Sequence, residues 1–183
     1  MAITIQRKGY GQVEPNHLSA QYTGQIYAQL PAMTTGASAA AIGQLENGQF
    51  LKYNYAADCA STAGDGEWLL VYCEEKLYDE RHQGHKDFVL KKTDFADQKI
   101  YPRLLKTNVG DIFTTNMFGG PGTGYDTLVA TSVSLGKGNY LTVGADGILA
   151  KANAKPESGM YFQVVAETTM PDGQTGVKIQ RIA

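Results

Sequence analysis

Apolar and polar residues alternate along much of the chain after residue 43. Leu51, Tyr53 and Tyr55 are separated by polar side chains, so a strand would place all three on one face. The segment Leu128–Leu135 shows the same period of two. Such a period is typical of half-buried strands, because successive side chains of a strand point to opposite faces. The pattern therefore predicts a series of short strands.

One apolar run lacks this alternation. Trp68–Cys73 is continuous and apolar, and it has the length of a strand. Runs of this kind are typical of strands that are buried on both faces. We therefore expect this segment in the middle of a sheet.

Turn residues separate the predicted strands. The pair Asn47–Gly48 is a strong hairpin signal, and we expect it to join a strand ending near Leu45 to one beginning at Phe50. Residues 144–147 read Gly-Ala-Asp-Gly and lie between two short apolar segments. We expect a second hairpin there.

The C-terminal segment has the clearest pattern. Two alternating stretches flank a turn at Pro171–Gly173. The residues expected to face inward from this pair are Phe162, Val164, Ala166, Val177 and Ile179. Many short strands with Gly and Asp turns, and without helices between them, indicate an all-β fold, an antiparallel β-barrel or sandwich.

The first 42 residues differ from the rest and form a predicted extended N-terminal arm (residues 1–42), followed by a body (residues 43–183). The arm has no sustained period, and no Asp, Glu, Lys or Arg occurs between Glu14 and Glu46. Its apolar side chains need a surface to cover, either on its own body or on a neighbouring molecule, and the sequence leaves both open. The candidate anchors of the arm are Tyr10, Tyr22, Ile26, Tyr27 and Leu30.

Residues 74–99 interrupt the strand pattern as a charged excursion. They hold 13 of the 34 charged residues of the chain. A density of this kind is typical of a solvated face. We expect this segment to lie at the surface of the body.

Composition excludes several classes of protein. The chain has 183 residues, with Lys plus Arg 16 and Asp plus Glu 18, so its formal net charge is −2. Nucleic-acid binders normally carry a basic stripe, and this chain has none, so we expect no nucleic-acid partner. No apolar run approaches the roughly 18 residues of a membrane span, and we expect no membrane partner. The N-terminus lacks the apolar core of a signal peptide.

The charged excursion also holds the first candidates for chemistry. The candidate metal ligands are Asp79, Glu80, His82 and His85. The candidate acid–base carboxylates are Glu74, Glu75, Asp79 and Glu80. Metal sites need three or four converging ligands, and glycosidic catalysis needs two carboxyl groups across a cleft. Proximity in a charged run indicates neither arrangement.

Other candidate sites are equally weak. The loop Gly119–Gly124 is rich in glycine but lacks the Gly-Lys-Ser/Thr ending of a nucleotide-phosphate loop. We expect Cys73 to be a core thiol and Cys59 to lie in an exposed loop without thiolate activation. Ser61 and Ser132 lack a nucleophile motif. The sequence therefore predicts no catalytic residue, no metal site and no cofactor, in a protein that is not an enzyme.

Two segments, Gln12–Pro31 and Tyr101–Asn116, carry a resemblance to a known group. With them go a Val-Gly-Asp strand entry at 109–111, an Asp-Gly hairpin, and a closing Val-Lys-Ile-Gln strand at 177–180. This pattern resembles small structural proteins of tailed bacteriophages that decorate or cement the head shell. Such proteins are sometimes labelled head-fibre or minor capsid proteins.

The resemblance implies a non-enzymatic protein on the outer surface of the virion capsid, made in the bacterial host cytoplasm. Its implied partners are the major capsid protein and other copies of itself, most often in trimers. The anchors of the N-terminal arm would contribute to these contacts. On this hypothesis, deletion of residues 1–42 leaves a folded body that no longer binds shells.

Two other functions stay open. A carbohydrate- or receptor-binding module displayed on the virion, as a head fibre or tail component, would use exposed tyrosines and the loop at 119–125. A hydrolase would use residues 74–80 with His82 and His85. Single alanine substitutions in those residues would then cause large losses of activity.

Overall fold

The computed structural model describes residues 2–6, 11, 13–19, 26–28, 44–72, 89–91, 102–118, 133–171 and 173–183. Within these ranges the chain forms strands, turns and bends, and no helix. The strands are β1 (Ile3–Ile5), β2 (Val13–Ser19), β3 (Ile26–Ala28), β4 (Gln44–Glu46), β5 (Phe50–Asn54), β6 (Cys59–Ser61), β7 (Asp65–Val71), β8 (Val89–Lys91), β9 (Leu104–Leu105), β10 (Ile112–Thr115), β11 (Val133–Leu135), β12 (Tyr140–Val143), β13 (Leu149–Ala152), β14 (Tyr161–Thr169) and β15 (Thr175–Arg181).

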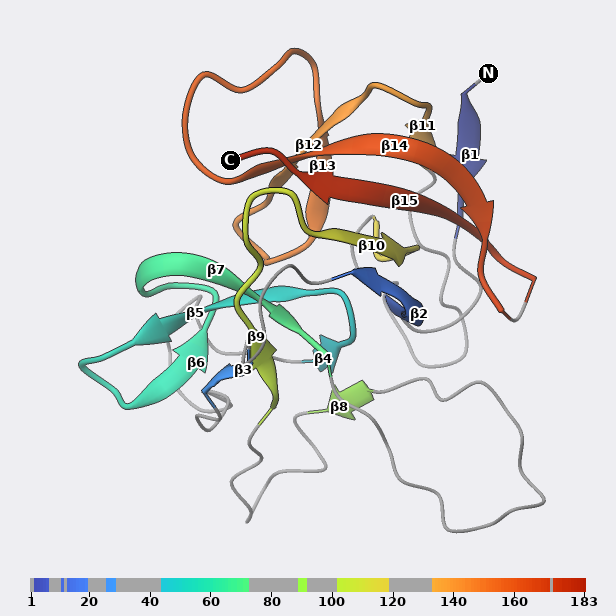
Figure 1. Cartoon of the computed structure of the whole chain (residues 1–183). Coiled ribbons are helices and arrows are strands. Elements are labelled where there is room, and N and C mark those ends of the chain that lie inside the picture. The colour runs from blue at the N-terminus through green and yellow to red at the C-terminus, as the bar shows by residue number, and fades with distance from the viewer. Residues whose placement is uncertain are drawn as a thin grey trace, which may run out of the picture.

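The larger of two main sheets has six strands in the order β13-β12-β14-β15-β10-β2. Every neighbouring pair in it is antiparallel. Phe118, which follows β10, forms a parallel bridge to Leu149 at the start of β13. This bridge brings two strands from opposite parts of the sheet together, so the sheet is a curled half-barrel (Figure 1).

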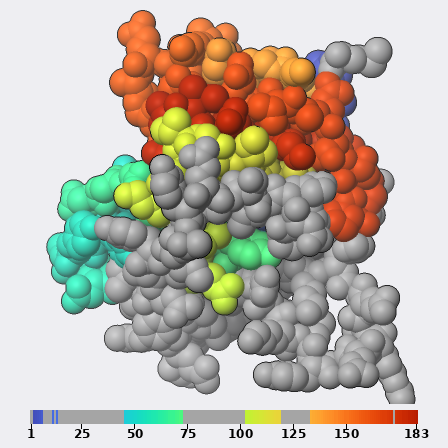
Figure 2. All heavy atoms as spheres, viewed as in Figure 1, coloured from blue at the N-terminus to red at the C-terminus, as the bar shows by residue number. Residues whose placement is uncertain are grey.

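The second main sheet has five strands in the order β3-β9-β7-β5-β6, all antiparallel. Strand β7 lies at its centre and contains most of the apolar run at 68–73. Two small sheets pair β1 with β11 and β4 with β8. Figure 2 shows the C-terminal strands at the top of the molecule and residues 44–72, in cyan and green, on its left flank.

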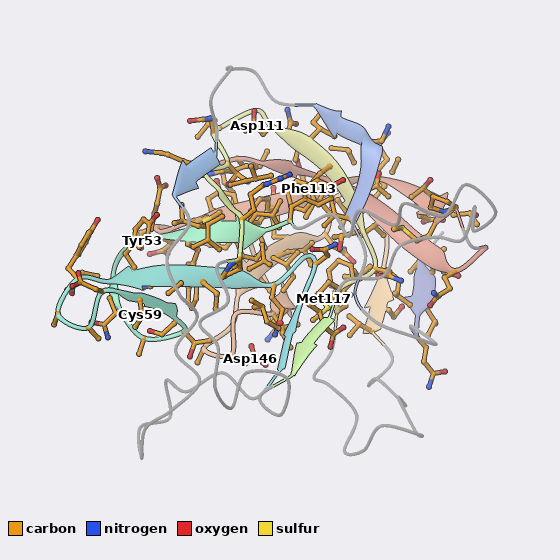
Figure 3. All side chains as sticks on the ribbon, turned by 90° about the horizontal axis from the view of Figure 1, so that it is seen from below. Tyr53, Cys59, Asp111, Phe113, Met117 and Asp146 are labelled. Carbon is orange, nitrogen blue, oxygen red and sulfur yellow. The ribbon has the colours of Figure 1, made fainter. Side chains whose placement is uncertain are left out.

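The main hydrophobic core combines side chains from both large sheets. Phe162 of β14 lies with its ring centroid 5.5 Å from that of Phe50 on β5 and 5.7 Å, edge to face, from that of Phe113 on β10. All three rings are fully buried. Figure 3 shows Phe113 in this packed interior. Contacts between aromatic rings add about 0.5–1.5 kcal/mol per pair to the effect of burial.

A second cluster lies on the opposite face of the five-stranded sheet. It includes Leu69 and Val71 of β7, whereas Leu70 and Tyr72 belong to the main core. Successive side chains of the central strand are therefore buried on alternate faces. This confirms that the apolar run lies centrally and is buried on both sides.

The all-β, antiparallel fold predicted from the sequence is confirmed. The two predicted C-terminal hairpins also form, because β12 pairs with β13 and β14 pairs with β15. In the first hairpin, the N–H of Gly147 donates to the carbonyl of Gly144 at 3.0 Å. In the second, the N–H of Gly173 donates to the carbonyl of Met170 at 2.9 Å.

The hairpin expected at Asn47–Gly48 is wrong in its pairing. A turn does form, and Gly48 has φ +91, a backbone conformation that favours glycine. However, β4 pairs with β8, and β5 pairs with β6 and β7. The Gly48 N–H donates to the carbonyl of Val71 at 3.0 Å, so the turn carries the chain from a small sheet into a large one.

The predicted inward face of β14 is also corrected at one residue. A bulge between Val164 and Ala166 shifts the register, so that Ala166 pairs with Lys178. Opposed residues share a face, and Lys178 lies between the two core residues Val177 and Ile179. The bulge therefore breaks the alternation after Val164, and Ala166 is half-buried and not part of the main core.

Candidate partner-binding surface

Three described stretches of the N-terminal arm are strands within the sheets. Strand β1 pairs with β11, β2 with β10, and β3 with β9, all antiparallel. The arm therefore adds strands to its own body along these stretches. The predicted boundary at residue 42 stays a prediction, because residues 29–43 lie outside the described residues.

Two of these strands occupy the borders of the large sheets. Among the described strands, β2 lies at one border of the six-stranded sheet, with β13 at the other, and β3 lies at one border of the five-stranded sheet, with β6 at the other. Pro15 lies within β2, which agrees with the restriction of proline to edge strands. A sheet border leaves backbone N–H and C=O groups that a further strand can pair with.

Two side chains of the arm belong to the main core. Ile5 of β1 is 1% exposed and Val13 of β2 is 5% exposed. Deletion of residues 1–42 would remove both. We therefore expect that truncation to destabilise the body, so point substitutions are the cleaner test of the arm.

Gly11 fixes the arm between β1 and β2. Its N–H donates to Oε2 of the buried Glu46 side chain. A Cβ at this position would lie 2.2 Å from Sδ of Met117 and 2.7 Å from the backbone oxygen of Asn47. Only glycine fits so close to Met117 and Asn47, so the arm is attached here by a hydrogen bond and by tight packing.

The structure places two of the five predicted anchors. Ile26 and Tyr27 lie in β3, at the border of the five-stranded sheet. Tyr10, Tyr22 and Leu30 lie outside the described residues. Partner contacts of all five stay a prediction.

A charged clasp (Glu67, Lys106 and Arg181) ties the two large sheets together. Oε1 of Glu67 on β7 lies 2.9 Å from Nζ of Lys106, and Oε2 lies 3.1 Å from Nη2 of Arg181 on β15. Nη1 of Arg181 also donates to the backbone oxygen of Thr107. Burial alone would raise the pKa of Glu67, but the hydrogen bonds and charges of the two cations outweigh it and lower that pKa.

The turn between β5 and β6 exposes an aromatic side chain. Tyr55 is 61% exposed, and its ring centroid lies 5.7 Å from that of the buried Tyr53. It follows the strand predicted to carry it, so it does not share the buried face of Leu51 and Tyr53. Nζ of Lys52 on β5 lies 4.8 Å from the centroid of the Trp68 ring on β7, a cation–π contact.

The prediction of an exposed loop at Cys59 is wrong. Cys59 lies in β6 and is 6% exposed; its strand pairs with β5, where Cys59 is opposite Asn54 and Ala60 is opposite Tyr53 (Figure 3). Burial, with a smaller effect of the Asp58 carboxylate, raises the pKa of the Cys59 thiol. This is the opposite of what activates a nucleophilic thiolate. Ser61, also in β6, is fully buried, and its Oγ donates to the carbonyl of Ala63.

Most of the other sequence candidates for chemistry lie outside the described residues. They are Glu74, Glu75, Asp79, Glu80, His82, His85, Cys73, Ser132 and the loop at 119–124. Of the charged excursion at 74–99, the structure describes β8, which pairs with β4. The described ranges contain no group of three or more His, Cys, Asp or Glu side chains placed to hold a metal ion. They also contain no helix long and apolar enough to cross a membrane.

Sequence reasoning missed Gly11 and the clasp. No local pattern marks Glu67, Lys106 and Arg181 as partners, because up to 114 residues of chain separate them. Gly11 carried a weak signal, since a glycine in a strand-forming region often marks a close approach of backbone.

Comparison of the chain with protein-family models, with curated proteins and with solved structures finds no match.

Proposed function

We propose that the protein is a non-enzymatic virion structural protein that decorates a bacteriophage head and stabilises it by binding major capsid subunits. The N-terminal arm contributes to these contacts on the outer surface of the capsid. The observation that carries the proposal is the position of β2 and β3. Among the described strands, the arm supplies one of the two border strands of each large sheet.

The charge of the arm supports a role in binding. Strand β3 lies at a sheet border within the segment between Glu14 and Glu46, which contains no Asp, Glu, Lys or Arg, whereas the border strand β2 carries Glu14 and Pro15. Charged residues, lysine above all, are the usual means by which proteins keep such borders from pairing with other chains. The uncharged border at β3 suits a chain that adds to a partner by strand pairing.

The rigidity of the body supports the same role. Two packed sheets share one core, and the clasp joins them at one end. A body of this kind loses little conformational freedom when it binds, which favours affinity. On a shell with many identical sites, weak single contacts also add to a large total effect.

The test uses shells from a phage stock in which the gene for this chain has been deleted. The purified chain is mixed with the shells, and the bound amount is measured by co-sedimentation. The double substitution Tyr22→Ala/Tyr27→Ala should lower occupancy at least tenfold while circular dichroism stays that of a β protein. With the chain added well below saturation, a tenfold loss of occupancy corresponds to about 1.4 kcal/mol of binding free energy.

The matched control is Tyr55→Ala, an exposed tyrosine of the body. It should bind shells as the unmodified chain does. Unchanged occupancy of the Tyr22/Tyr27 double variant would contradict the role of the arm. Failure of the unmodified chain to sediment with shells would contradict the head-decoration function itself.

A carbohydrate- or receptor-binding module displayed on the virion is the second candidate. The exposure of Tyr55 beside Tyr53 favours it, because aromatic faces contact sugar rings. On this alternative, the isolated chain binds glycans in an array and Tyr55→Ala abolishes that binding. A blank array would remove the alternative.

A further inference from the structure

The crossover (residues 106–111) is the link between the two large sheets. It leaves β9 in the five-stranded sheet and enters β10 in the six-stranded sheet. Its second half is fixed by backbone hydrogen bonds to β15. The N–H of Gly110 donates to the carbonyl of Arg181 at 2.9 Å, and the N–H of Arg181 donates to the carbonyl of Asp111 at 2.9 Å.

The first half of the crossover is fixed by side chains. Lys106 binds Glu67, and Thr107 accepts hydrogen bonds from Arg181 through its backbone oxygen and, at 3.3 Å, its Oγ1. Glu67 belongs to β7, whereas Arg181 belongs to β15. One carboxylate therefore connects the crossover, the central strand of one sheet and a strand of the other.

We propose that the Glu67 carboxylate is an acid-sensitive clasp that holds the crossover against β7 and β15. Protonation of Glu67 removes the negative charge that both Lys106 and Arg181 face. The two cations then repel each other without compensation. The crossover loosens locally, while β14 and β15 keep their long pairing and their buried core residues.

The charged surroundings of Glu67 set the direction of this effect. The groups facing its carboxylate are Lys106 from the crossover and Arg181 from β15. Side-chain exposure is 34% for Glu67 and 12% for Arg181, so water screens the contact only in part. Asp111 also lies on the crossover, where its Oδ2 accepts the N–H of Asn108 at 2.7 Å.

The pH range follows from the sign of the shift. The lowered pKa of folded Glu67 means that the carboxylate stabilises the fold above the ordinary pKa of about 4.5. That contribution is lost as the pH falls through the lowered value. The clasp is therefore closed at neutral pH and opens in acid.

The experiment measures amide hydrogen exchange by NMR on the full chain between pH 6 and pH 3. Rates are expressed as protection factors, which remove the intrinsic dependence of exchange on pH. The reporters are the amides of Gly110 and Asp111, whose acceptors are backbone carbonyls. The amides of Val164 and Ile179 report on the core of the body.

In the unmodified chain, crossover protection should fall about threefold or more on acidification, before protection of the core falls. Glu67→Gln should show the lowered protection already at pH 6 and no further fall that is specific to the crossover. Lys106→Gln removes one cation of the clasp and should halve the effect. It serves as the second variant if Glu67→Gln does not fold.

Glu157→Gln is the matched control, since Glu157 is exposed in the turn between β13 and β14. It should retain the full acid response. An equal acid response in the unmodified chain, Glu67→Gln and Lys106→Gln would overturn the proposal. Simultaneous loss of protection in the crossover and in the core would overturn it as well.

Discussion

Gly11 attaches the N-terminal arm to the body at a position where a larger side chain does not fit. Gly11 is buried between the Glu46 carboxylate, the Asn47 backbone and the Met117 side chain. Met117 is itself fully buried, so it has little space into which to move. This position couples the arm to the turn at 46–49 more tightly than any apolar pattern in the sequence indicates.

Gly11→Ala should therefore lower the free energy of unfolding by about 1–3 kcal/mol, the usual range for overpacking a filled core. Urea denaturation followed by fluorescence of Trp68 measures the change. In a Met117→Ala background the same substitution should cost less, because the nearest clashing atom is gone. Equal costs in both backgrounds would show that Met117 does not set the tight fit.

The N-terminal arm differs from a free tail because its described stretches pair as strands with the body. β1 and β2 each contribute a buried side chain to the core, and β2 pairs with β10 at the border of the six-stranded sheet. Strand pairing of this kind depends on partners more than 90 residues away in sequence, such as β2 with β10. A segment without its own period can therefore be ordered by the body beside it.

Val13→Ala tests the place of β2 in the core. Removing two buried methyl groups should lower the free energy of unfolding by about 2 kcal/mol, from lost burial and the remaining cavity. Val109→Ala is the same change at a site that is 58% exposed, and it should stay within about 0.5 kcal/mol of the unmodified chain. Chemical denaturation compares the two variants. Equal stabilities for both would contradict a core position for Val13.

The sequence predicted elements that depend on local signals. The apolar run around Leu70 and the turn at 144–147 identify a central strand and a hairpin, because burial on both faces and turn chemistry act within a few residues. Which strands pair with one another was harder to predict from the sequence. The turn at Asn47–Gly48 forms, but β8 supplies the partner of β4. The bulge before Ala166 also has no local mark, since it arises from register against β15.

The candidate site was predictable only in part, for the same reason. Lack of charge between Glu14 and Glu46 is a local property and identified the arm as unusual. The clasp between Glu67 and Arg181 joins residues from two sheets, and a buried position for Cys59 follows from pairing of β6 with β5. The clasp depends on how distant strands meet, which composition and spacing do not encode, whereas β5 and β6 are consecutive strands and the turn between them was missed.

The whole molecule combines a body of two packed sheets with border strands from the N-terminal arm, of which β3 is uncharged. A curled six-stranded sheet packs on a five-stranded sheet, and the crossover with its clasp joins them. The N-terminal arm supplies one border strand to each of them. The proposed function assigns the remaining backbone groups of these border strands, and the anchors near them, to a neighbouring capsid subunit.

Cryo-electron microscopy of shells decorated with the full chain tests most directly whether the N-terminal arm contacts a capsid subunit. The account predicts density for β2 or β3, with the adjoining anchors Tyr22 and Tyr27, in contact with a major capsid subunit. Decorated shells in which the arm contacts its own body alone, with the subunit contacted by another part of the chain, would contradict it.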